Sequence, residues 1–168
     1  LENNNGIPFE TDNLAKTIKL LTNKKRRVSC HYLIDTNGTI YNLVEEKKRA
    51  WHAGESKWKR SKDINSRSIG IEIVYPGEVL GKKYKKTQIE SLIKLSLFLK
   101  KKYKIGKQNI LGHSDVAPDR KIDPGIYFPW EFLSKKSLGL WAKNRLNNLK
   151  LDEDNQKLFL KNLQRIGY

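Results

Sequence analysis

The chain has 168 residues, a formal net charge of +16, one cysteine and 38% hydrophobic residues. This length and apolar content suit one folded domain with a substantial core and exclude a disordered chain. The positive charge favours a polyanionic partner such as nucleic acid, an anionic membrane surface or an acidic cell-wall polymer, but a general Lys and Asn bias of the sequence explains it equally well. One cysteine excludes an internal disulfide, and no apolar run reaches the roughly 18–20 residues of a transmembrane segment.

The first half of the chain predicts one helix and three strands. A helix is expected over residues 13–22, a hairpin with an Asn-Gly turn over residues 28–44, and a short strand over residues 68–74. This last strand reads S-I-G-I-E-I-V, so one carboxylate, Glu72, interrupts an apolar run. A Glu within a buried strand is costly unless it is paired, which favours a residue kept for chemistry over one on a wet strand face.

The second half predicts mostly helices. Residues 87–103 form the clearest helix, with a capping box expected between Thr87 and Glu90. A short strand is expected over residues 109–112, and further helices from about residue 127 and over residues 152–168. The alternation of strands and helices predicts an α/β fold with a mixed central β-sheet flanked by helices.

A polar loop over residues 112–125 carries the strongest chemical signal. It reads G-H-S-D-V-A-P-D-R-K-I-D-P-G, and its Pro and Gly residues restrict the backbone while little apolar content remains for packing. His113 and Asp123 lie ten positions apart across this loop and could reach one metal ion. Imidazole and carboxylate are ordinary zinc ligands, but this pair alone is more often part of an ordinary surface loop.

This loop, followed by F-P-W at 128–130, resembles the zinc-dependent N-acetylmuramoyl-L-alanine amidases of bacterial peptidoglycan turnover, a family related to phage amidases and animal peptidoglycan-recognition proteins. Further blocks in the family's order are V-S-C-H-Y-L-I-D at 28–35, G-T-I-Y-N-L-V at 38–44, R-A-W-H-A-G-E-S at 49–56 and I-N-S-R-S-I-G-I-E-I-V at 64–74. The resemblance covers roughly residues 13–141.

The resemblance implies catalytic roles for four residues. His113 and Asp123 match zinc ligands, Glu72 matches the proposed general base, and Lys121 matches the cation beside the scissile carbonyl. These roles are chemically coherent, since a zinc-activated water needs a base to take its proton and a cation to stabilise the oxyanion.

Other residues match the substrate cleft. His52 and Asn65 look like cleft residues and Trp51 like part of the wall, although Trp51 is equally well explained as a core aromatic. Arg120 either meets the carboxylates of the stem peptide or is simply exposed. His31 does not correspond to a ligand in the family and is expected to be a hydrogen-bonded structural residue.

The implied function is hydrolysis, with a Zn²⁺ cofactor, of the amide bond between N-acetylmuramic or anhydromuramic acid and L-alanine, in peptidoglycan or soluble muropeptides. The alternative is a non-catalytic peptidoglycan-recognition module with an incomplete metal site, which would not need Glu72 and Lys121. A nucleic-acid-binding domain rests on charge alone, because no recognised nucleic-acid-binding pattern is present.

One departure concerns the N-terminus. The family's first zinc ligand is a His at the end of a leading strand, and residues 1–12 contain no His. Either the third ligand lies upstream of Leu1 or this protein has lost it. We expect the former, on a strand that remains bound noncovalently if it is a separate N-terminal fragment. The sequence does not decide between the cell envelope or periplasm and the cytoplasm, because that information lies in the N-terminal region.

The expected domain organisation is a catalytic domain over residues 1–142 and, over residues 143–168, a linker with the start of a helical peptidoglycan-binding module. The polar segment from Lys143 to Lys150 is the best candidate linker. A plain terminal helix explains the last residues equally well.

Overall fold

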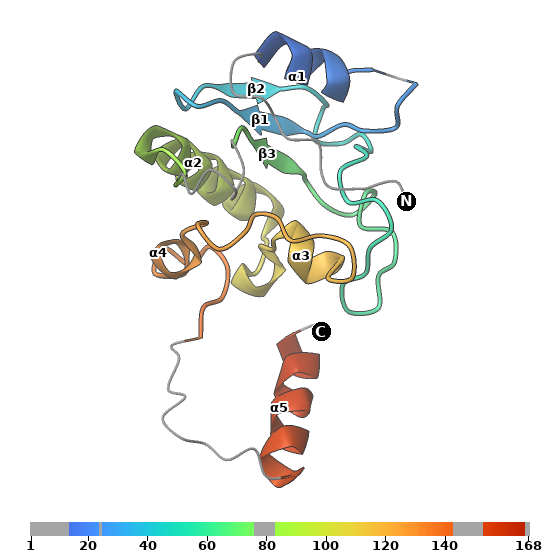
Figure 1. Cartoon of the computed structure of the whole chain (residues 1–168), viewed down its shortest axis with the longest axis vertical. Coiled ribbons are helices and arrows are strands. Elements are labelled where there is room, and N and C mark those ends of the chain that lie inside the picture. The colour runs from blue at the N-terminus through green and yellow to red at the C-terminus, as the bar shows by residue number, and fades with distance from the viewer. Residues whose placement is uncertain (1–13, 24, 76–82, 143–152, 167–168) are drawn as a thin grey trace.

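The computed structural model describes residues 14–23, 25–75, 83–142 and 153–166. Its elements, in chain order, are α1 (Leu14–Leu21), β1 (Tyr32–Ile34), β2 (Ile40–Asn42), β3 (Ile71–Ile73), α2 (Lys86–Tyr103), the 3-10 helix η2 (Lys107–Asn109), α3 (His113–Val116), α4 (Trp130–Ser134) and α5 (Glu153–Ile166) (Figure 1).

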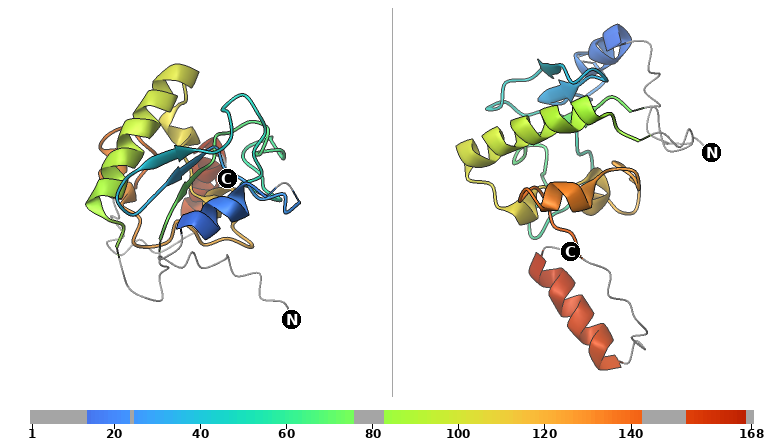
Figure 2. Two further views of the ribbon diagram at one scale, coloured as in Figure 1. Left: turned by 90° about the horizontal axis from the view of Figure 1, so that it is seen from above. Right: turned by 90° about the vertical axis from the view of Figure 1, so that its left-hand side faces the viewer.

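The three strands form one mixed sheet in the order β2-β1-β3. The central strand β1 pairs antiparallel with β2 and parallel with β3. Helices α1 and α2 lie on opposite faces of this sheet, as Figures 1 and 2 show from different directions. The predicted fold class, a mixed sheet flanked by helices, is therefore confirmed.

Side chains of β1 alternate between two cores because successive residues of a strand point to opposite faces. Leu33 is 1% exposed and packs with Leu21 of α1 and with Cys30. Ile34 is fully buried on the other face, where the apolar stripe of α2 covers it. That stripe consists of Ile89, Leu92, Leu95 and Leu99.

The register between β1 and β3 determines where the strand carboxylate points. Glu72 lies opposite Leu33, whereas its neighbours Ile71 and Ile73 pack against the core under α2. Directly paired residues share a face of the sheet, so Glu72 projects to the Leu33 side. The strand therefore places Ile71 and Ile73 in the core under α2 and Glu72 on the opposite face.

The capping prediction for α2 is wrong in detail. The N-cap residue is Lys85, and the Gln88 side chain accepts a hydrogen bond from the Lys85 amide at 3.1 Å. Thr87 therefore lies inside the first turn, where its hydroxyl donates to the Thr36 carbonyl at 3.2 Å. This hydroxyl therefore bonds to the hairpin turn and does not cap the helix.

The predicted strand over residues 109–112 is also wrong. The structure has the 3-10 helix η2 and then an irregular segment, with the Ile110 amide bonded locally to the Lys107 carbonyl at 3.3 Å. A strand forms only where a neighbouring strand satisfies its backbone groups, and in the described part of the chain none pairs with this segment. The other strands are correct in position but shorter than predicted.

The last helix, α5, confirms the helix predicted near the C-terminus. Residues 143–152 lie outside the described residues, so the division into 1–142 and 143–168 stays a prediction. Within the described segments, every helix is too short or too polar to cross a bilayer.

Candidate metal and catalytic site

Two close contacts shape the loop that carries the candidate ligands. A Cβ atom at Gly112 would lie only 2.6 Å from Cδ of Pro124, so the absence of a side chain lets the two ends of the loop meet. The Ser114 amide also donates to the Asp123 carbonyl at 2.9 Å. As a result, α3 begins with His113 facing the other end of the loop.

The two predicted ligands are in direct contact. Nδ1 of His113 lies 3.1 Å from Oδ2 of Asp123, and Nε2 of His113 lies 3.1 Å from the Ala53 carbonyl oxygen. A carbonyl only accepts hydrogen bonds, so Nε2 donates to the Ala53 oxygen and Nδ1 is the ring nitrogen that faces the carboxylate. Metal-ligating histidines commonly have such a partner on the second nitrogen.

This geometry fits two positions of a zinc site. Ligand atoms about 2.0–2.2 Å from one tetrahedral ion lie roughly 3.3–3.5 Å apart, close to the observed 3.1 Å. Two acceptors facing each other also need a proton or a cation between them. Across the described ranges, however, no group of three or more His, Cys, Asp or Glu side chains is arranged to hold a metal ion.

Glu72 shares an electrostatic environment with this loop. Burial raises the pKa of Glu72 and the Asp123 carboxylate raises it further, while His113 and Lys121 act in the opposite direction. The structure thus brings together all four residues that the sequence assigned to catalysis. A carboxylate with a raised pKa is a stronger base, as proton transfer near neutral pH requires.

Asn65 fixes the backbone segment whose Ala53 carbonyl contacts His113. Asn65 is 5% exposed, and its Oδ1 accepts hydrogen bonds from the backbone amides of His52 at 2.9 Å and Ala53 at 2.8 Å. These bonds position the Ala53 carbonyl that His113 contacts. The Asn65 oxygen is engaged by the backbone, and its direct contact with substrate stays a prediction.

His52 lies between the site and a second histidine. Its pKa is lowered to about 4, first by burial and then by His31 and His113, so the ring is neutral at physiological pH. Its Nε2 is buried and has no hydrogen-bond partner among the described residues. The neutral His52 ring lies beside His113, and its contact with substrate stays a prediction.

His31 is a structural residue, as predicted. It is 1% exposed, its Nδ1 accepts from the Gly70 amide at 3.1 Å, and its Nε2 donates to the Lys48 carbonyl at 3.0 Å. Both nitrogens are satisfied, so this ring has no free position for a metal.

The remaining predicted cleft residues have other partners. Trp51 is 39% exposed, which excludes a core role, and its ring stacks with the guanidinium groups of Arg49 at 4.2 Å and Arg27 at 5.7 Å. Arg120 donates to the Ala53 carbonyl and, at 2.8 Å, to the Glu55 carbonyl. Arg120 therefore fixes the backbone of residues 53–55, which contacts His113. Its contact with stem carboxylates stays a prediction.

Sequence reasoning missed two supporting groups. The buried Cys30 thiol lies against the Glu72 backbone, and its pKa is raised by burial and by the Glu72 charge. The Tyr84 hydroxyl donates to the Pro124 carbonyl at 2.9 Å, next to Asp123. No local pattern marks either residue, because both contacts join segments that are distant in the chain.

The N-acetylmuramoyl-L-alanine amidase family model matches residues 7–126, which is more than half of the chain. The chain belongs to this amidase family. It is 38% identical over 148 residues to the N-acetylmuramoyl-L-alanine amidase AmiD of Escherichia coli, covering 80% of this chain and 53% of that protein. It is 44% identical to the 1,6-anhydro-N-acetylmuramyl-L-alanine amidase AmpD of Haemophilus influenzae, covering 62% of this chain and 56% of that protein.

Solved structures agree with the sequence comparisons. E. coli AmiD in complex with its substrate, anhydro-N-acetylmuramic acid-L-Ala-D-γ-Glu-L-Lys, superposes with a TM-score of 0.78 at 33% identity, covering 94% of this chain and 68% of that one. AmpDh3 of Pseudomonas aeruginosa in complex with an anhydromuramic pentapeptide gives a TM-score of 0.76 at 31% identity, covering 92% and 69%. The chain spans about half the length of the curated relatives it matches.

Proposed function

We propose that this amidase-family chain is the catalytic part of a zinc-dependent hydrolase that cuts the amide bond between N-acetylmuramic or anhydromuramic acid and L-alanine. The observation that carries the proposal is the convergence of Glu72 with the His113–Asp123 pair and Lys121. The anhydromuramyl peptides bound to the similar amidases support the same class of substrate.

Zinc held by His113 and Asp123 would activate a water molecule and polarise the carbonyl of the lactyl group. Glu72 takes the proton from the attacking water, a role to which its raised pKa is suited, and returns it to the nitrogen of L-alanine as the amide bond breaks. The products are the muramyl carboxylate and a free amino group on the peptide.

Lys121 supplies a positive charge near both carboxylates of the site, since it lowers the pKa values of Glu72 and Asp123. In the reaction it stabilises negative charge on the substrate's carbonyl oxygen, a contribution typically worth 100- to 1000-fold in rate. His52 and Trp51 are proposed to contact the sugar or the peptide, and Asn65 and Arg120 to support the backbone beneath them.

A catalytic zinc site needs a third protein ligand. We propose that it comes from outside the described residues, from the His that the family resemblance implies on a strand before Leu1. Zinc affinity should then be at least tenfold higher for the gene product that includes the preceding segment, as measured by competition with a chelator. Equal affinity with and without that segment would contradict this ligand assignment.

The test of function is hydrolysis of purified muropeptide by the zinc-loaded gene product and its Glu72→Gln variant. Loss of the base should lower kcat by at least 100-fold while bound zinc stays near one per chain. Glu45→Gln is the matched control, because this carboxylate is exposed and pairs with the exposed Lys48 at 2.6 Å. Zinc binding without hydrolysis by the wild type would favour the recognition module over the enzyme.

A further inference from the structure

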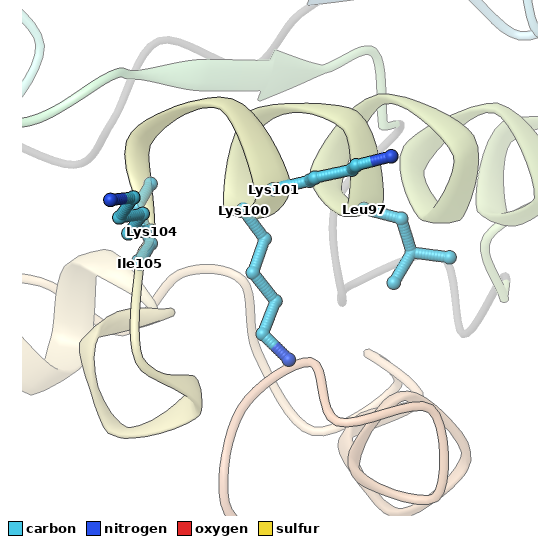
Figure 3. Close-up of a pocket in the computed structure, with 5 residues that line it drawn as sticks. All are labelled: Leu97, Lys100, Lys101, Lys104 and Ile105. Atoms are coloured by element: carbon cyan, nitrogen blue, oxygen red, sulfur yellow. The ribbon is translucent and has the colours of Figure 1, made fainter.

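A basic groove runs along the outer side of α2, away from the core stripe. Its first part is an open cavity of about 610 Å³ lined by Leu97, Lys100, Lys101, Lys104 and Ile105. Figure 3 shows Leu97 at one end of this surface, Lys104 and Ile105 at the other, and the Lys100 and Lys101 side chains between them, pointing in different directions. The lining thus combines lysines with an apolar floor formed by Leu97 and Ile105.

The second part of the groove is a cavity of about 470 Å³ between α2 and the segment around α4. Four lysines line it, namely Lys83, Lys86, Lys94 and Lys136, together with the aromatic side chains of Tyr84, Tyr127 and Phe132. The same combination of cations and apolar surface therefore continues toward the N-terminus of α2.

Helix spacing joins the two cavities. Lys94, Leu97 and Lys101 follow one another at intervals of three or four residues, so they lie on one face of α2, and Lys104 follows at its C-terminal end. Lys100 of the first cavity donates to the Ser137 carbonyl at 3.0 Å, and the adjacent Lys136 lines the second cavity. The segment 136–137 therefore contacts residues of both cavities.

Most of the groove's positive charge is uncompensated. Glu90 is the one acidic residue among the described side chains that line it, and it lies 3.8 Å from Lys86. Lys101 and Lys104 have no acidic partner in the described segments, whereas neighbouring Lys102 is paired with Glu46 at 2.7 Å. Like charges held along one face raise the local potential and attract polyanions.

The backbone of Lys104 supports a role for its side chain. This residue ends α2 in the left-handed conformation, with φ 52° and ψ 40°. Glycine is the ordinary residue at such a position, because other residues are strained there. A lysine at this position has no stability advantage over glycine, which points to a use for its charge.

One end of the groove adjoins the candidate catalytic site. Tyr84 lines the second cavity, and its hydroxyl donates to the carbonyl of Pro124, the residue after Asp123. Tyr84 thus connects the second cavity to the loop that carries Asp123. Helix α2, Lys86–Tyr103, is about 27 Å long at about 1.5 Å per residue.

We propose that this groove binds neighbouring acidic stem peptides of polymeric peptidoglycan, away from the stem that is cut. This inference rests on the proposed function. The lysines pair with stem carboxylates, and the apolar floor accepts the aliphatic parts of the stems. Nucleic acid fits less well, since the Lys136 ammonium lies over the Phe132 ring at 5.2 Å and competes with a base for that face.

The test measures cosedimentation with purified insoluble peptidoglycan at about 50 mM salt, in a Glu72→Gln background so that the polymer is not digested. The double variant Lys101→Gln/Lys104→Gln should bind roughly ten- to thirtyfold more weakly, with a shallower salt dependence. Lys19→Gln/Lys47→Gln is the control of equal net charge, since both lysines are exposed and lie elsewhere. An equal loss in the control would overturn the proposal.

Two further measurements separate the outcomes. With Glu72 intact, the Lys101→Gln/Lys104→Gln variant should hydrolyse soluble muropeptide at the wild-type rate. If the wild type hydrolyses no muropeptide but the double variant still binds the polymer more weakly, the proposed function is contradicted and the groove is supported. Lys104→Gly should keep or raise the thermal midpoint while weakening binding, which a purely structural lysine would not do. Tighter, groove-dependent binding to single-stranded DNA than to peptidoglycan would overturn the assignment.

Discussion

Replacement of Gly70 by Ala tests how strictly the strand before Glu72 is packed. An added Cβ would lie 2.3 Å from Cγ, 2.5 Å from Cδ2 and 2.8 Å from Cβ of His52. His52 cannot simply rotate away, because its ring packs against His31 at a centroid distance of 5.6 Å and its backbone amide is bonded to Asn65. Either β3 or the His52 segment must move.

The expected loss of stability is about 1–3 kcal/mol, the usual range for overpacking a core. For a chain of this size, that loss lowers the thermal midpoint by about 2–12 °C. Because Glu72 lies two residues further along the same strand, we also expect kcat to fall at least tenfold, since small displacements of catalytic groups are costly.

Thermal unfolding followed by circular dichroism and a muropeptide hydrolysis assay measure these effects. The matched control is Gly106→Ala, where φ is −68° and the new Cβ meets only the flexible amide end of Gln108 at 2.6 Å. This control should leave stability unchanged or raise it by about 0.4–1 kcal/mol. Equal midpoints for the two variants would refute the packing argument at Gly70.

Two other changes test supporting contacts. The pKa of Glu46 is lowered to about 2 by hydrogen bonds from Lys102, Tyr103 and Tyr32, so its stabilisation is present above pH 4.5 and is lost as pH falls toward 2. Glu46→Gln should therefore lower the free energy of unfolding by about 1–2 kcal/mol at pH 7, a figure reduced because Lys102 is exposed to solvent. Urea titrations at several pH values should also show that the variant lacks this acid dependence. An unchanged dependence of stability on pH would contradict the prediction. Asn65→Ala leaves the buried Ala53 amide and the half-buried His52 amide without their acceptor and should cost about 2–4 kcal/mol in the same assay. A loss below about 0.5 kcal/mol would contradict this prediction.

The contact between the two candidate ligands was predictable because its signal is local. His113 and Asp123 lie in one loop whose Gly and Pro residues are typical of a tight turn, and the surrounding letters match one family. Glu72 was identifiable for another local reason, since it interrupts an apolar strand. The third ligand was expected upstream of Leu1, and that expectation stays a prediction.

Backbone pairing was less predictable. Residues 109–112 have the apolar character of a strand, yet strand formation depends on a neighbour that no local pattern describes. Thr87 looks like an N-cap, but its hydroxyl bonds to Thr36 across the fold. In both cases a distant partner decides which hydrogen bonds are made.

The sequence alone determined the family, the mixed α/β fold and the four residues proposed to catalyse the reaction, because these depend on residue identity and short-range spacing. Tertiary structure alone revealed that Ala53, Asn65 and Arg120 support His113, and that lysines of α2 line two cavities, one of them together with Lys136. These arrangements join segments far apart in the chain. Their hydrogen bonds and charges meet only after the sheet and α2 have packed.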